Sequence, residues 1–258
     1  MKIPFNLIIL YIIIGTLPGI IWASYYLSED SKNPEPKGKI IQIFLLGMLI
    51  TVPTVAAEIS ASCALGYSCA FYGDRVLYSN KLLANPFLEK FIFIFLVIAC
   101  IEEIFKFTII KSEVLKTKEF DEPVDAMVYS IVASLGFASA ENILYVFKYA
   151  NPARTSIERF FTAVLIHALT GAIIGYFIGL VKIWEMKQNQ FLPGVRSSKK
   201  TLKNISLGII LAILLHGSYN FLISFDNNLM MLALALIIII ALLVSLGFEK
   251  LKTTCYLH

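Results

Sequence analysis

Two neighbouring glutamates inside an apolar stretch are the first residues of this sequence that could do chemistry. Glu102 and Glu103 precede Lys106, which on a helix can reach either carboxylate. Consecutive helical residues point about 100° apart, so the two glutamates need not share a role. An ionisable side chain at bilayer depth costs at least about 2.5–3.5 kcal/mol, so each needs a partner or a purpose. We predict that one glutamate is a general base that deprotonates water; the alternative is a structural ion pair.

A third carboxylate lies in the next apolar stretch. Phe137, Glu141 and Tyr145 recur at intervals of four residues and form one helical stripe, with Asn142 beside it. No basic residue lies within one turn of Glu141 on its own helix, so its partner must come from another helix. The alternative is a protonated carboxyl group with a structural role.

Two of the three histidines of the chain follow, in separate apolar stretches. His216 and Asn220 are four residues apart and share a helix face, where both can donate hydrogen bonds to a carbonyl oxygen as it becomes an oxyanion. A lone histidine such as His167 is more often structural. Because these histidines neighbour the stretches that carry the glutamates, we expect Glu102, Glu141, His167 and His216 to line one cavity.

Glycines recur at intervals of four after His167, at Gly171, Gly175 and Gly179. A ridge of small residues lets a second helix approach closely in a membrane. We expect the backbone of another span to pack against the helix that presents His167.

The amino-acid composition indicates which kind of structure positions these side chains. Of the 258 residues, 58% are hydrophobic and 16% are charged, with a mean hydropathy of +0.76, whereas soluble domains are near half apolar and a quarter charged. The apolar runs are long enough to cross a hydrocarbon core as helices and lack the alternation of strands. We predict an all-α polytopic membrane helical bundle, one domain over residues 1–258. Its seven spans are expected at 5–27, 40–60, 88–110, 124–148, 158–182, 203–224 and 229–248.

The stretch 61–87 is ambiguous, because it begins apolar and turns polar. It fits either an interfacial helix or an eighth span. Cys63 and Cys69 within it can pair if they lie outside the cell, although we expect buried apolar thiols.

The loops predict the orientation in the cell membrane. With seven spans, one side collects twice as many lysines and arginines as the other, and it includes the loop 182–203. The positive-inside rule places this loop and the C-terminus in the cytoplasm. The net charge of +4 reflects this bias, so we expect lipids and no nucleic acid as partners.

In order along the chain, these motifs resemble those of PrsW-type intramembrane proteases, relatives of the CAAX prenyl proteases and bacteriocin-processing enzymes. The resemblance covers residues 88–224, which we take as the catalytic core. The matching motifs are Glu102-Glu103-x-x-Lys106, Phe137-Ala-Ser-Ala-Glu141-Asn142-x-x-Tyr145, His167-Ala-x-x-Gly171 and His216-Gly-x-x-Asn220.

The resemblance implies hydrolysis of a peptide bond in a membrane-anchored protein, such as the first cut of an anti-sigma factor. By analogy with the CAAX-protease relatives, Glu102 activates the water with support from Glu103, and His167 helps to position that water. His216 and Asn220 form the oxyanion site. The chain departs from those relatives at two positions: Lys106 stands where they have arginine, and Glu141 stands where they have histidine.

Two other mechanisms use the same residues. Zinc needs three protein ligands and a water, which His167, His216 and a carboxylate can supply, but no HExxH motif is present and Asn220 fits a metal-free reaction better. We therefore predict no cofactor, with zinc as the alternative. A proton-coupled transporter with Glu141, His167 and Lys106 as a relay is a rival function. A non-catalytic scaffold that recruits partners through the loop 182–203 is another.

Overall fold

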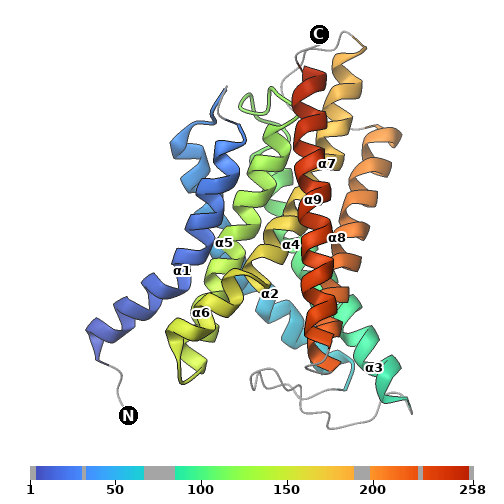
Figure 1. The fold of residues 1–258 in the computed structure, drawn as a ribbon. Coiled ribbons are helices and arrows are strands. Elements are labelled where there is room, and N and C mark those ends of the chain that lie inside the picture. The colour runs from blue at the N-terminus through green and yellow to red at the C-terminus, as the bar shows by residue number, and fades with distance from the viewer. Residues whose placement is uncertain (1–3, 31–32, 67–84, 189–197, 226–228, 256–258) are drawn as a thin grey trace.

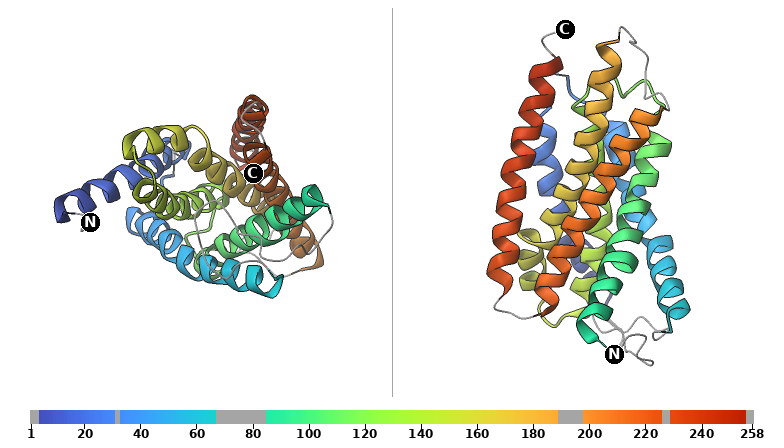
Figure 2. Two further views of the ribbon diagram at one scale, coloured as in Figure 1. Left: turned by 90° about the horizontal axis from the view of Figure 1, so that it is seen from below. Right: turned by 90° about the vertical axis from the view of Figure 1, so that its right-hand side faces the viewer.

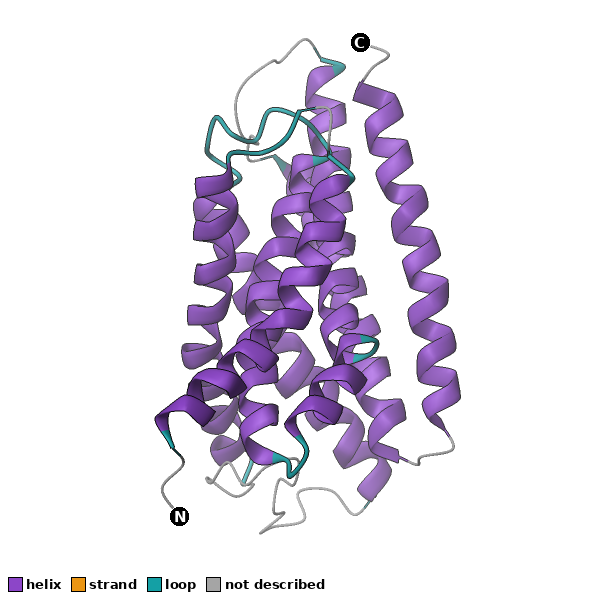
Figure 3. Cartoon of the chain, turned by 60° about the vertical axis from the view of Figure 1, so that its left-hand side comes forward, coloured by secondary structure: helices purple, strands orange, loops and turns teal. Residues whose placement is uncertain are grey.

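The computed structural model describes residues 4–30, 33–66, 85–188, 198–225 and 229–255, and these ranges are helical without any strand (Figure 3). The helices are α1 (Phe5–Ser28), α2 (Lys37–Ala64), α3 (Pro86–Ile92), the π-helical segment η1 (Phe93–Ala99), α4 (Cys100–Glu113), α5 (Asp125–Lys148), α6 (Pro152–Phe160), α7 (Ala163–Met186), α8 (Lys199–Phe225) and α9 (Met230–Cys255).

The helices form an all-α polytopic bundle, as predicted. Six segments of the described part of the chain are long and apolar enough to cross a membrane: α1, α2, α5, α6 with α7, α8 and α9. The seventh pass is the continuous run of α3, η1 and α4, which contains the predicted span 88–110. Figure 1 shows the amino end of α1 at one end of the bundle and the carboxyl end of α9 at the other, as an odd number of passes requires.

The predicted span 158–182 differs from the structure at its start. Asn151 caps the short helix α6, its side chain accepting a hydrogen bond from the backbone N–H of Arg154 (3.1 Å), and Pro152 follows at the first helical position. Thr162, with φ −125° and ψ −96°, then breaks the helix, so the span proper begins at Ala163. The break separates α6 from α7 and lets α6 take its own direction.

The ambiguous stretch 61–87 is described only at its ends. Helix α2 continues to Ala64, and Gly66 ends the turn with a φ of 80° that favours glycine. Residues 67–84, including Cys69, lie outside the described residues, and α3 begins at Pro86. Cys63 takes part in a disulfide bond, so the expectation of an unpaired thiol is wrong at this position.

Helices α5 and α7 form the centre of the bundle. In their apolar windows 67% and 78% of the residues are buried, against 22% for α1, α2 and α9. Figure 2 shows the outer helices around this pair. The glycine ridge of α7 faces α5, because a Cβ added at Gly171 or Gly175 would meet the backbone carbonyl oxygen of Ser130 or Ala126. The expected close approach is confirmed, and it sets the distance between the helices that carry Glu141 and His167.

Replacement of Gly175 by valine should destabilise the bundle. The side chain would collide with the backbone of α5, and overpacking of this kind costs about 1–3 kcal/mol. We expect thermal unfolding of the purified protein in detergent to begin at a lower temperature. Gly38→Ala is the matched control, because nothing lies within 4 Å of an added Cβ there; equal effects of both variants would contradict the role of the ridge.

Candidate active site

The acidic motif lies on α4, directly after the π-helical segment η1. Single-turn π-helical segments are frequent at functional sites. Glu103 is fully buried, and the Lys106 ammonium lies 2.5 Å from its Oε1, which confirms the pairing expected from their spacing. Glu102 points elsewhere on the helix, and its side chain makes no ion pair with Lys106 in the described part of the chain. The two glutamates therefore have separate surroundings, as their spacing predicts.

His216 reaches this motif from α8. Its Nδ1 lies 2.8 Å from Glu103 Oε1. An ionised carboxylate only accepts hydrogen bonds, so Nδ1 carries the proton and donates it. This contact fixes the tautomer, and the other nitrogen, Nε2, lies 3.9 Å from Glu102 Oε2. Glu103 thus orients the imidazole toward Glu102.

His167 reaches the same place from α7. Its Nδ1 lies 3.0 Å from Lys106 Nζ and its Nε2 lies 2.9 Å from Glu141 Oε2. The ammonium only donates, so Nδ1 is the acceptor and Nε2–H is the donor to Glu141. The Nδ1 atom lies 4.0 Å from Glu102 Oε2, and the two imidazole rings meet edge to face at 4.9 Å. Both histidines, each oriented by a carboxylate, bring a ring nitrogen to within about 4 Å of Glu102.

The partner that Glu141 needs from another helix is Arg159, at the start of the predicted span 158–182. Arg159 comes from α6, and its side chain is only 12% exposed. One nitrogen, Nη2, donates to Glu141 Oε2 (2.9 Å), and Nε donates to Asn142 Oδ1 (2.9 Å). The guanidinium stacks on Tyr145, 3.8 Å from the ring centroid. Asn142 in turn donates to the carbonyl oxygen of Gly15 (2.8 Å), which ties α5 to α1.

Glu58 of α2 is a fourth carboxylate at this site, and none of the sequence motifs includes it. It interacts electrostatically with Glu102 and Glu141, and its enclosed Oε1 accepts no hydrogen bond in the described part of the chain. A glutamate near the end of an apolar run was the available signal. Asn220, in contrast, is half-buried one turn after His216 and forms no side-chain hydrogen bond within the described ranges.

The site also contains residue types that could hold a metal ion. One atom each of Glu102, His167 and His216 lies within 4.8 Å of the others, and Glu102 Oε2 is buried without a hydrogen bond from the described residues. Each histidine gives its second nitrogen to a carboxylate, the arrangement usual around metal-bound histidines. Four glutamates face two cations, Lys106 and Arg159, so two protons or one divalent cation would balance the charge.

The comparisons with known proteins agree with the geometry. The family model described as PrsW family intramembrane metalloprotease matches residues 35–246. Protease PrsW of Geobacillus kaustophilus is 31% identical over 209 residues, which cover 81% of this chain and 77% of that protein. Protease PrsW of Oceanobacillus iheyensis is 32% identical over 209 residues, which cover 81% of this chain and 80% of that protein. Protease PrsW of Bacillus subtilis is 28% identical over 83% of both chains. No solved structure matches the chain.

Three findings lead to one assignment. The described residues form a bundle with six helical segments apolar enough to cross a membrane, a buried cluster of carboxylates and histidines lies within it, and the family match covers most of the chain. This chain belongs to the PrsW family of intramembrane proteases.

Proposed function

We propose that this peptidase cleaves a membrane-anchored protein with a water molecule activated by Glu102. The supporting observation is the position of Glu102 Oε2, 3.9 Å from His216 Nε2 and 4.0 Å from His167 Nδ1. Two atoms about 4 Å apart can both reach one water at ordinary hydrogen-bond lengths of about 2.8 Å. Such a water would donate one hydrogen to Glu102 and lie beside the two ring nitrogens.

In the proposed reaction Glu102 takes the proton of the water as its oxygen attacks the scissile carbonyl carbon. Glu102 then passes this proton to the leaving nitrogen, so the carboxylate is regenerated. His216 can donate to the developing oxyanion only when Nε2 also carries a proton, and the Glu103 carboxylate at 2.8 Å stabilises that imidazolium. Asn220 keeps its predicted role as the second donor.

A metal is the alternative that the name of the family raises. Glu102, His167 and His216 would hold it, and a bound divalent metal would supply an activated water and polarise the carbonyl. Lys106 argues against this ligand set, because its ammonium lies 3.0 Å from His167 Nδ1 and would have to leave that nitrogen. For this reason metal-free hydrolysis remains our proposal.

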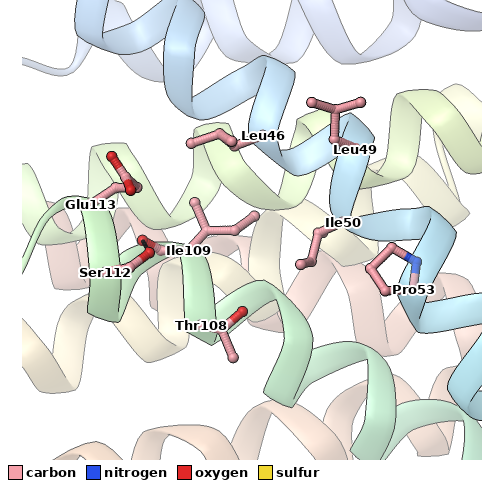
Figure 4. Close-up of a pocket in the computed structure, with 8 residues that line it drawn as sticks. All are labelled: Leu46, Leu49, Ile50, Pro53, Thr108, Ile109, Ser112 and Glu113. Carbon is pink, nitrogen blue, oxygen red and sulfur yellow. Dashed lines mark hydrogen bonds between the residues drawn. The ribbon is translucent and has the colours of Figure 1, made fainter.

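A groove beside α2 offers a route for the substrate. It lies between α2 and α4 and has a volume of about 340 Å³. Figure 4 shows apolar residues of α2 facing Thr108, Ser112 and their neighbours on α4. The groove borders α4, the helix that also carries Glu102 and Lys106, so a segment bound in it would lie against the helix that presents the site. An anti-sigma factor, as the resemblance implies, is a substrate of this kind.

The orientation predicted from the basic loops belongs to the same proposal. The C-terminus would be cytoplasmic, and the end of the bundle that carries Cys63 would face outward. The disulfide bond of Cys63 supports this, because disulfides persist in oxidising compartments. Membership in a peptidase family favours hydrolysis over the transporter and the scaffold considered from the sequence.

Replacement of Glu102 by glutamine should abolish cleavage of a tagged single-pass protein in liposomes. The amide cannot accept the proton, and loss of a general base lowers rates by about 10²- to 10⁴-fold. Glu249→Gln on α9, which removes an exposed carboxylate, is the matched control and should cleave normally. Unimpaired cleavage by Glu102→Gln, with both proteins equally folded, would rule out the proposed role.

The same assay decides between the two mechanisms. We expect a strong zinc chelator to leave the cleavage rate unchanged, and elemental analysis of the purified protein to find substoichiometric zinc. Chelator-sensitive cleavage restored by zinc, with one zinc per chain that is lost in His216→Ala, would replace the metal-free mechanism.

Arg159 can be tested against a neighbour on the same short helix. Arg159→Gln should leave Glu141 without its buried cation, and breaking such a pair costs about 3–5 kcal/mol. Thermal unfolding should shift to lower temperature, and cleavage should fall because His167 loses its orienting carboxylate. Arg154→Gln removes an exposed arginine and should change neither. Equal behaviour of the two variants would show that the Arg159 pair is dispensable.

A further inference from the structure

A second cluster of carboxylates lies far from the active site, where two connections between helices meet. One connection joins α1 to α2 and the other joins α4 to α5, at the end of the bundle that holds the carboxyl end of α9 (Figure 1). Their acidic residues form what we call the end cluster, which consists of Asp30, Glu35, Asp121, Glu122 and Asp125.

Asp125 is the centre of the end cluster. Single carboxylate oxygens of Asp30, Glu122 and Asp125 lie within 4.8 Å of one another, and the same holds for Glu35, Asp121 and Asp125. Asp125 is fully buried and is the first residue of α5. Its Oδ2 accepts hydrogen bonds from the backbone N–H groups of Asp121 (3.1 Å) and Glu122 (2.6 Å), which curl the preceding turn around it.

Two oxygens of the end cluster are left without a donor. Asp30 is only 5% exposed and Asp125 is 0% exposed, yet Asp30 Oδ2 and Asp125 Oδ1 are enclosed and accept no hydrogen bond from the described residues. A buried carboxylate oxygen in this state loses its hydration without compensation. Such oxygens, which converge from separate segments of the chain, are suited to a ligand that supplies positive charge.

Two lysines of the described part of the chain lie near the end cluster. Lys252 donates to Glu29 (2.6 Å) and Lys182 donates to the carbonyl oxygen of Phe120 (3.0 Å), so both ammonium groups also serve partners outside the end cluster. The five carboxylates lie close together, so their charges repel one another.

We propose that the end cluster binds a hard divalent cation, Ca²⁺ or Mg²⁺, with Asp125 and Asp30 as its principal ligands. Both ions prefer carboxylate oxygens. Oxygens bound to one Ca²⁺ at about 2.3–2.6 Å lie at most about 5 Å apart, and the observed separations are within this limit. The ligands are all oxygen, unlike the histidine-rich active site, so the two sites select different metals.

A bound cation would hold the segment between α1 and α2 against the segment between α4 and α5. These connections lead into α2 and out of α4, the two walls of the groove near the active site. Lys39 of α2 already pairs with Glu113 of α4 at this end (3.4 Å). The cation would therefore stabilise one end of the groove without taking part in hydrolysis.

The rival explanation is a shared proton, because the carboxyl groups of Asp125 and Glu35 are close enough to form a hydrogen bond when one of them is protonated. The experiment separates the two. Purified full-length protein in detergent is stripped with a chelator, and its unfolding temperature is measured at neutral pH while Ca²⁺ or Mg²⁺ is added. Ligand binding to the folded state raises this temperature in proportion to RT ln(1 + [L]/Kd).

We expect one cation to raise the unfolding temperature of the wild type and to bind at one ion per chain in equilibrium dialysis. Asp125→Asn should weaken binding at least about tenfold, yet be no less stable than the wild type without cation, because the substitution removes repulsion. Asp30→Asn serves as a second variant if Asp125→Asn does not fold. Glu119→Gln, on the same connection but outside the end cluster, and Glu102→Gln should both bind like the wild type.

Absence of any cation-dependent shift in the wild type would establish the shared proton and overturn the proposal. Equal shifts in the wild type, Asp125→Asn and Asp30→Asn would place the bound ion elsewhere and overturn it as well. Loss of the shift in Glu102→Gln would assign the ion to the active site.

Discussion

Charge compensation between helices is the constraint on which the structure of this protease depends. A carboxylate in the hydrocarbon region is tolerated only when another group supplies charge or hydrogen bonds. Glu103 is compensated by Lys106 and His216, and Glu141 is compensated by Arg159 and His167. Three of these four contacts join different helices, so the cost of burying the charges also determines which helices lie side by side.

Charge compensation also sets the state of the side chains that could react. Because Glu103 and Glu141 each accept from one nitrogen of a histidine, the tautomer and the rotation of both rings are set before any substrate arrives. Glu102 differs from these two glutamates: one nitrogen of each histidine lies about 4 Å away, and its Oε2 has no donor among the described residues. An uncompensated carboxylate surrounded by groups that are fixed in place is the arrangement that a general base or a metal ligand needs.

The amino-acid sequence predicts the order of the passes and the core of the site, because a charged residue inside an apolar run is costly and therefore conspicuous. There is a physical reason why the sequence does not reveal Arg159 and Glu58 as members of the site. Each lies near the end of a predicted span, where charged side chains normally extend to the interface, and only the turn of α6 and the packing of α2 bring them inward. Asn220 shows the converse: helical spacing places it beside His216, but spacing does not determine which groups it contacts.

Helix α2 runs from the end of the bundle where it is tied to α4 to the active site. At its start Lys39 and Gln42 bind Glu113 of α4, so the beginning of α2 is held against α4. Pro53 lies inside α2, where it cannot donate a backbone hydrogen bond and weakens the helix. Glu58 follows just over one turn later, at the active site. The weakest point of α2 therefore lies between its fixed end and its carboxylate, beside the groove.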